Sequence, residues 1–149
     1  MTRRAVVIGI GHCLPAKAVT NAELAAKVDT SDEWIRERTG ITQRYIAEQG
    51  QLTSDLAVPA AQEAIAMACV EPASIDLVIV ATTTPDDTMP STATKVQHRL
   101  GITGGAAFDM NAACSGFVYA MTVANSFIVA GTARRVLVVG AETYSRILN

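Results

Sequence analysis

Four short runs of apolar residues constrain the fold of this chain more than any other feature. They span residues 4–10, 77–82, 106–110 and 136–140, and each is apolar on consecutive positions rather than on alternate ones. A strand that is apolar on both faces must be covered on both sides, as in a parallel sheet between two layers of helices. The sequence therefore predicts an α/β fold with helices on both faces of a mostly parallel sheet.

Helix signals alternate with these strands. Capping boxes at 20–23 and 30–33 each open a short helix, and Gly40 ends the second. The Ala-rich segment 56–69 favours a helix, and Ser91 caps another that runs to Leu100. Residues 115–130 form a long helix that is apolar almost all round and stops at Gly131, so we expect it to be central and buried.

Length and composition indicate the number of domains and how much apolar surface must be buried. The chain has 149 residues, which fits one domain. Half of them are hydrophobic, only 17% are charged and the mean hydropathy is +0.27, against about 25% charged residues in an average soluble domain. We therefore expect a large buried interface with another subunit or with further chain.

Several functional classes are disfavoured. The net charge of −2 does not suit a nucleic-acid-binding protein, and no apolar run is long enough to predict a membrane span. Three widely spaced cysteines without a CxxC pair predict neither a disulfide framework nor a metal site, and fit a reducing cytoplasm. Gly9 and Gly11 are interpreted as a turn rather than a dinucleotide fingerprint, because the third glycine is missing.

Cys114 is the candidate catalytic residue. It follows the predicted strand 106–110 and directly precedes the long helix, on a sharp strand-to-helix turn. The first N–H groups of a helix have no partner within the helix and carry partial positive charge, so they can stabilise a thiolate or an oxyanion. Small neighbours would let a thioester approach the sulfur. The alternative, a small buried cysteine without a chemical role, is equally compatible with this local pattern.

Further segments carry a resemblance to a known family. They read Val-Asp-Thr-Ser-Asp-Glu-Trp-Ile at 28–35, Arg-Thr-Gly-Ile at 38–41, Ala-Thr-Thr at 81–83, Phe-Asp to Phe at 108–117 and Val-Val-Gly-Ala-Glu at 138–142. Together they resemble β-ketoacyl-acyl-carrier-protein synthase III, a condensing enzyme of the thiolase-like superfamily. The resemblance implies a thiolase-like half-fold over residues 1–149, with a mostly parallel five-stranded sheet and a buried central helix that bears the cysteine.

The resemblance also implies a reaction. An acyl-CoA, commonly acetyl-CoA, would acylate the cysteine at position 114, and malonyl-acyl-carrier protein would then lose carbon dioxide and condense with the acyl group. This reaction initiates type II fatty acid synthesis and divides a difficult condensation into two steps. The implied enzyme is a cytoplasmic homodimer that uses coenzyme A thioesters as substrates and has no tightly bound cofactor.

Four more positions match family sites. Trp34 matches the tryptophan that stacks the adenine of coenzyme A, Arg38 an arginine near the phosphates and adenine, and Thr30 a threonine that hydrogen-bonds the base. Met89 falls where some members carry a phenylalanine that shapes the acyl pocket across the dimer interface. A flexible thioether there leaves the preferred primer open. Trp34 and Met89 could instead pack in the core, and Arg38 could be a solvated charge.

The family's catalytic histidine and asparagine lie in a C-terminal half that this sequence does not contain. His12 and His98 do not match that histidine, and we expect both to be structural or solvated. Asp86 and Asp87 are interpreted as solvated charges. The chain is thus predicted to be an N-terminal half whose partners are acyl-CoA, acyl-carrier protein and its own C-terminal half. A ketosynthase of a specialised pathway and a non-catalytic interaction module remain alternatives.

Overall fold

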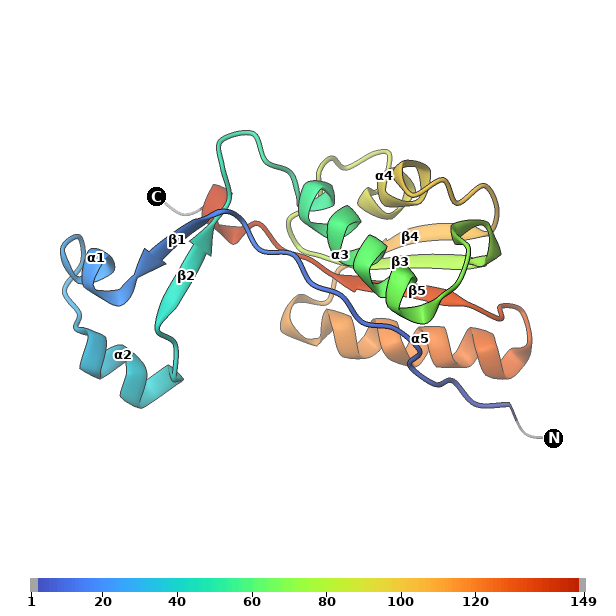
Figure 1. Ribbon diagram of the computed structural model, residues 1–149, viewed down its shortest axis with the longest axis horizontal. Coiled ribbons are helices and arrows are strands. Elements are labelled where there is room, and N and C mark those ends of the chain that lie inside the picture. Colours follow the sequence, from blue (N-terminus) through green and yellow to red (C-terminus); the bar gives the residue numbers. More distant parts are fainter. Residues whose placement is uncertain (1–2, 148–149) are drawn as a thin grey trace. The chain divides into compact units, whose positions relative to one another are not determined.

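The computed structural model describes residues 3–147, which divide into two compact units. The first unit contains residues 3–13 and 52–144, and the second contains residues 14–51 and 145–147. Figure 1 shows the elements of both. Each unit is described by itself.

The first unit is built on a parallel sheet of three strands. They are β3 (Leu77–Ala81), β4 (Ala106–Met110) and β5 (Val136–Gly140), in the order β4-β3-β5. Leu77 lies opposite Ala106 on one side and Val136 on the other. The central strand β3 is buried along its whole length, as its unbroken apolar sequence predicts.

Helices cover both faces of this sheet (Figure 1). On one face lie α3 (Thr53–Ala68) and α4 (Thr92–Arg99), whose Ala57 and Val96 share a core cluster with Val78. On the other face lies α5 (Gly116–Ala130), whose Ala120 and Ala124 share a second cluster with Ile79. The period of two in β3 thus sends alternate side chains into the two cores. The predicted α/β class with helices on both faces is confirmed.

The second unit pairs β1 (Lys17–Thr20) with β2 (Gln43–Ile46) in an antiparallel ribbon. Between these strands lie α1 (Asn21–Ala25) and α2 (Asp32–Thr39). The capping box of α1 forms as predicted, because the Thr20 hydroxyl accepts from the Glu23 N–H and the Glu23 carboxylate accepts from the Thr20 N–H. In α2 the cap is Ser31 rather than Thr30, and Gly40 ends the helix at φ 69°.

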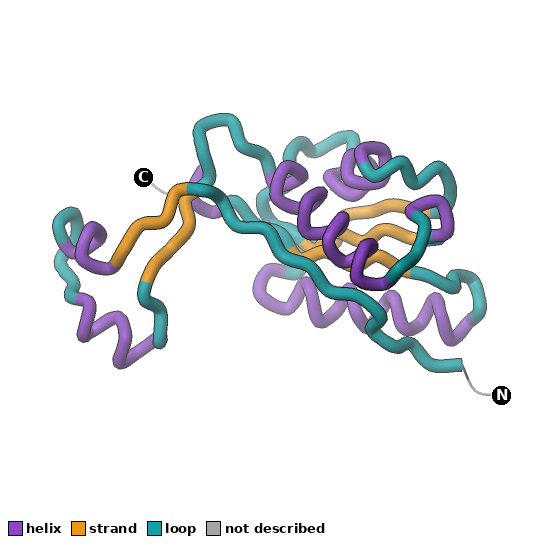
Figure 2. The backbone as a smooth tube through the Cα atoms, in the orientation of Figure 1, coloured by secondary structure: helices purple, strands orange, loops and turns teal. Residues whose placement is uncertain are grey.

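A single five-stranded sheet is not what forms. The parallel sheet has three strands, the other two paired strands belong to the second unit, and the predicted strand at 4–10 does not pair (Figure 2). That segment is extended and lies along α5 and α3, where the Ala5 N–H donates to Asn125 and the His12 N–H to Glu63. Its apolar side chains are mostly exposed, at 54–68% for Val6, Val7, Ile8 and Ile10.

The glycines of this segment are used for close packing and not for a turn. A Cβ on Gly9 would lie 2.2 Å from the carbonyl oxygen of Ala64, and one on Gly11 would lie 2.2 Å from that of Ala60. Both carbonyls belong to α3. The backbone therefore passes α3 at a distance that only glycine permits, and the turn interpretation was wrong.

Helix α5 is not buried all round. Gly116, Ala120 and Ala124 face the sheet and are buried, whereas the opposite face is exposed. The exposed apolar residues of α5 are Phe117, Val118, Tyr119, Met121 and Val129. The predicted full burial is wrong for the described chain because the sheet covers only one side of the helix.

The segment 113–130 is also long and apolar enough, by length and composition alone, to cross a membrane, with 17% of it buried. No such segment was predicted from the sequence. One helix of this kind is weak support for a membrane span, because core helices of water-soluble proteins meet the same criteria.

Candidate active site

The turn between β4 and α5 carries Cys114. After Met110 the chain makes a short 3₁₀ turn, Ala113–Ser115, and then enters α5. The thiol lies within this turn and is exposed. The predicted strand-to-helix turn is thus observed, and the alternative of a small buried cysteine does not describe this structure.

Backbone strain is present immediately before the thiol. Ala113 has φ 45°, a left-handed conformation that a residue with a Cβ adopts at a cost of order 1–3 kcal/mol. Such outliers persist where surrounding structure holds them in place. Here the Ser115 N–H donates to the Ala112 carbonyl at 3.1 Å and tightens the turn. The backbone conformation of Ala113 therefore helps to set the direction in which the Cys114 side chain points.

The start of α5 is open to a ligand. The Ser115 side chain makes no capping hydrogen bond, so it places no acceptor against the partial positive charge at the start of the helix. The Gly116 N–H itself donates to the Ala113 carbonyl. The first turn is also packed tightly onto the sheet. A Cβ on Gly140 would lie 3.0 Å from the Phe117 ring, and one on Gly116 would lie 3.4 Å from Ala81. Two glycines thus let the first turn of α5 approach the carboxyl ends of β3 and β5.

The carboxylate of Glu142 lies at this same edge of the sheet, bonded to threonines of the loop that follows β3. The Glu142 carboxylate accepts from the Thr83 N–H at 2.8 Å, from the Thr83 hydroxyl at 3.0 Å and from the Thr84 hydroxyl at 2.6 Å. The Thr83 hydroxyl also lies 2.7 Å from that of Tyr144. The end of β5 thereby holds the loop that follows β3.

Sequence reasoning assigned no role to Glu142 or to the threonines. A signal was available, because both segments follow buried strands that are neighbours in the sheet. Carboxyl ends of parallel strands meet at one edge, where α/β proteins bind ligands. The strand order, which places β5 beside β3, could not be predicted from the sequence.

Met89 lies in the loop between β3 and α4 and is 84% exposed. This loop is anchored on both sides of Met89. Glu142 holds its start, and the Asp109 carboxylate accepts from the Thr92 and Ala93 N–H groups at 2.8 and 2.7 Å where the loop ends at α4. Met89 is therefore not core packing within the described chain.

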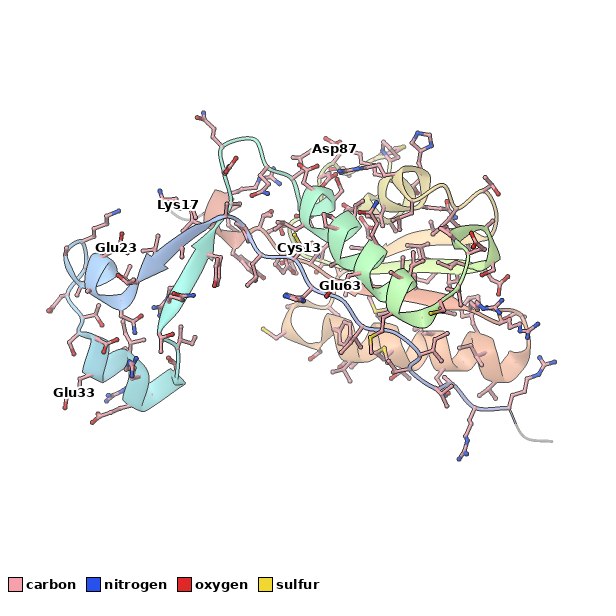
Figure 3. All side chains as sticks on the ribbon, viewed as in Figure 1. Cys13, Lys17, Glu23, Glu33, Glu63 and Asp87 are labelled. Atoms are coloured by element: carbon pink, nitrogen blue, oxygen red, sulfur yellow. The ribbon has the colours of Figure 1, made fainter. Side chains whose placement is uncertain are left out.

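The two aspartates before Met89 differ from each other. Asp87 is exposed as predicted and pairs with Lys95. The side chain of Asp86 is wholly buried, which contradicts its interpretation as a solvated charge. Its carboxylate accepts from the Ser54 N–H at 2.9 Å and lies 3.6 Å from the Lys95 ammonium. These contacts hold the loop to the first turn of α3, and Figure 3 labels Asp87 on the same loop. The hydrogen bond from Lys95 to Asp87 raises the pKa of this lysine.

The remaining candidates lie in the second unit. Trp34 is on α2 and 51% exposed. Arg38, one turn further on, places its guanidinium carbon 4.5 Å from the centroid of the indole ring, within the range of a cation–π contact. An exposed aromatic face beside a cation suits a base joined to phosphates. Thr30 is half-buried and precedes the capping Ser31.

The candidates thus form two groups. Cys114 and Met89 belong to the first unit, and Thr30, Trp34 and Arg38 belong to the second. Within the second group, the structure brings Trp34 and Arg38 into contact. His12 and His98 are both exposed. Among the described residues no cluster of histidine, cysteine and carboxylate side chains could hold a metal ion.

Known proteins match both the sequence and the fold. The model of the family 3-Oxoacyl-[acyl-carrier-protein (ACP)] synthase III matches residues 108–149. The Beta-ketoacyl-[acyl-carrier-protein] synthase III of Paramagnetospirillum magneticum is 59% identical over all 149 residues, which correspond to 46% of that protein. The chain thus spans about half the length of the curated relatives that it matches.

Solved structures of related enzymes have a similar fold. The 3-oxoacyl-acyl-carrier-protein synthase III of Aquifex aeolicus superimposes with a TM-score of 0.92 at 47% identity, over 99% of this chain and 47% of that one. The priming β-ketosynthase of the R1128 polyketide biosynthetic pathway superimposes with a TM-score of 0.88 at 37% identity, over 96% of this chain and 43% of that one.

Proposed function

Since this chain belongs to the β-ketoacyl-acyl-carrier-protein synthase III family and corresponds to its N-terminal half, we propose that it carries the acyl-accepting cysteine of such an enzyme. In the whole enzyme Cys114 receives the acyl group of an acyl-CoA primer, which is acetyl-CoA in the simplest case. The acyl group then condenses with malonyl-acyl-carrier protein.

The single observation that supports this proposal is the exposed thiol at the uncapped start of α5. The Cys114 thiolate attacks the thioester carbonyl carbon, and the resulting oxyanion is stabilised by the partial positive charge at the start of α5. The bond from carbon to the sulfur of coenzyme A then breaks, and this sulfur leaves with a proton from solvent or from the rest of the enzyme. The product is an S-acyl cysteine.

The second step needs groups from outside this chain. Malonyl-acyl-carrier protein loses carbon dioxide, and the carbon so freed attacks the acyl carbonyl and releases the Cys114 sulfur. The histidine and asparagine that stabilise the malonyl thioester in the family belong to the C-terminal half. We therefore assign acylation to this half and condensation to the two halves together.

Coenzyme A binding is assigned to the second unit. The exposed indole of Trp34 offers a face on which adenine stacks, for about 1–3 kcal/mol. Arg38 covers part of the same ring system and supplies a positive charge for the phosphates. Thr30, half-buried before α2, is assigned a hydrogen bond to the base. No metal and no tightly bound cofactor is assigned to the reaction.

The exposed apolar surface of the first unit supports further partners. We assign the outer face of α5 to contact with the C-terminal half, which accounts for its exposure here and for its resemblance in composition to a membrane span. In the described part of the chain β4 is an edge strand of the sheet. This edge and the exposed Met89 support a homodimer in which Met89 contributes to the primer pocket of the partner. The three cysteines form no disulfide among the described residues, which suits a cytoplasmic enzyme.

Intact-mass measurement of the whole enzyme after incubation with acetyl-CoA tests the proposal. We expect one acetyl group on Cys114, none in Cys114→Ala, and normal labelling in the control Cys69→Ala. Cys69 is a matched control because it is also an exposed thiol in the first unit, at the far end of α3. A wild-type enzyme that gains no acetyl group at Cys114 would refute the assignment.

A priming ketosynthase of a polyketide pathway is the second candidate, supported by the similarity to the R1128 enzyme and by a methionine at position 89. Acylation of Cys114 is common to both candidates. They differ in the primer and in the extender, so the rates with acetyl, branched and longer acyl-CoA and with malonyl-CoA or malonyl-acyl-carrier protein distinguish them. Activity restricted to acetyl-CoA and malonyl-acyl-carrier protein would exclude the second candidate.

A further inference from the structure

Asn21 is the one buried polar side chain in the described part of the second unit. It is the first residue of α1 and is 1% exposed. No candidate role had been given to it, because an asparagine beside a helix cap is ordinary on a surface. Burial of a side-chain amide is costly unless each of its polar groups has a hydrogen-bond partner. The role of Asn21 is therefore sought in the hydrogen bonds that its amide group makes.

The amide group of Asn21 contacts both ends of α2. Its nitrogen donates to the carboxylate of Asp32, the first residue of α2, at 2.8 Å. The same nitrogen donates at 2.8 Å to the carbonyl of Ile41, which follows the C-terminal cap Gly40. Both amide protons are thereby used, one at each end of the helix.

The oxygen of the amide completes the network. It accepts from the guanidinium of Arg44 on β2, and the Asn21 backbone N–H donates to the Thr42 carbonyl at 3.3 Å. One residue therefore joins α1, both ends of α2 and the strand that follows. Figure 3 labels Glu23 on α1 and Glu33 on α2, which mark the two helices.

Within the described chain, the apolar core that supports α2 is small. Ile35 is the only apolar residue of α2 that is buried, at 3%. With so small a core, the direction of the helix depends on hydrogen bonds at its ends. Trp34 and Arg38 both lie on α2, so the direction of α2 sets where the indole face and the guanidinium stand.

We propose that Asn21 is a positioning residue for nucleotide recognition, which holds α2 so that Trp34 and Arg38 receive the adenosine and phosphates of coenzyme A. The inference rests on the proposed function, and it adds a residue that does not touch the substrate. Asn21 acts only on the nucleotide part of the thioester. It has no effect on the chemistry at Cys114.

The sharpest test reverses the two donors. Asn21→Asp keeps the size of the side chain and suits the first turn of a helix, but it places an acceptor against the Asp32 carboxylate and the Ile41 carbonyl. In the whole enzyme we expect KM for acetyl-CoA to rise about tenfold with kcat and KM for malonyl-acyl-carrier protein unchanged. Acylation by acetyl-pantetheine, which lacks the nucleotide, should keep its wild-type rate.

Two further variants make the test specific. Gln43→Glu is the matched control, because it makes the same chemical change on β2 at a side chain whose one hydrogen bond within the described chain goes to Tyr45. Its KM should equal that of wild type. The double variant Asn21→Asp with Asp32→Asn restores a donor and an acceptor between the two positions, and should recover part of the lost affinity. Circular dichroism confirms that each variant is folded.

The outcomes distinguish a failure of the positioning role of Asn21 from a failure of the proposed function. An unchanged KM for acetyl-CoA in Asn21→Asp, or equal losses with acetyl-CoA and acetyl-pantetheine, would overturn the positioning role while leaving Cys114 acylation intact. Absence of acylation in the wild-type enzyme would overturn the proposed function itself, and the inference with it.

Discussion

Each of the two units of this chain is stabilised internally by a different kind of interaction. In the first unit β3 is buried between two apolar clusters, and the helices on each side contribute alanine and valine side chains to them. In the second unit only Ile35 and Asn21 are buried among the described residues. The unit that bears the candidate nucleophile thus depends on apolar burial, and the unit that bears the candidate nucleotide site depends on capping and polar contacts.

This difference suits the two proposed tasks. A nucleophile must be held to within a fraction of an ångström, which a rigid sheet with a strained turn can provide. A site that admits a large nucleotide from solvent needs exposed polar and aromatic groups on a small scaffold. The contrast implies that substitutions should have separable effects, on stability in one unit and on coenzyme A affinity in the other.

The largest expected effect is in the sheet. Ile79 on β3 is fully buried among α5 side chains, so Ile79→Ala should lower the free energy of unfolding by about 2–5 kcal/mol. Chemical denaturation of the whole enzyme measures this change in the free energy of unfolding. KM for acetyl-CoA of the folded fraction should stay at the wild-type value, and a raised KM would break the separation of the two units.

The next effect is on ligand affinity. Trp34→Ala removes a half-exposed ring and should weaken coenzyme A binding by about 1–3 kcal/mol, or roughly 5-fold to 150-fold in Kd. The unfolding midpoint should move little, because the ring is not in a core. Isothermal titration with coenzyme A measures the change in Kd, and a denaturation curve measures the unfolding midpoint. A large loss of stability would contradict this prediction.

A pair of helix caps offers a matched comparison. Ser31 caps α2 and Ser91 caps α4, each accepting from the N–H three residues on at 3.1 and 3.2 Å. Replacement by Ala should cost about 1 kcal/mol at either site, seen as faster amide hydrogen exchange in that helix. Only Ser31→Ala should also raise the Kd for coenzyme A, and equal effects of both on binding would contradict the assignment of α2.

The smallest expected effect depends on pH. Asp76 is exposed and accepts from the N–H groups of Arg135 and Arg134, which lower the pKa of its carboxyl group. A carboxyl with a lowered folded-state pKa stabilises the fold above its unfolded-state pKa, and this contribution is lost as pH falls through the folded-state value. Asp76→Asn should therefore be less stable than wild type at pH 7. The two proteins should converge in stability in acid, and a difference that grows as pH falls would refute this account.

Much of this arrangement could be predicted from local sequence. The three paired strands of the parallel sheet, the caps at Thr20 and Ser91 and the stop at Gly40 follow from rules that act over a few residues. The turn at Cys114 follows likewise from a strand directly succeeded by a helix. Relatives of known fold agree with this architecture.

What could not be predicted depends on which elements are neighbours. An apolar run at 4–10 satisfies the pattern of a strand, but pairing needs a free edge at the right place, and the segment instead lies along α3 and α5. Likewise α5 is apolar on all sides, yet a sheet can cover only one of them. Asp86 and Asn21 were buried by residues distant in sequence, which no local rule anticipates.

The sequence by itself therefore determined where the three parallel strands and the main helices lie, and which residue could act as nucleophile. These properties arise from backbone geometry and from side chains within one turn or one strand. Only the tertiary structure decided that Glu142 holds Thr83 and Thr84, and that Asn21 spans both ends of α2. Hydrogen bonds between distant segments depend on strand order and helix direction, which are set by packing of the whole unit.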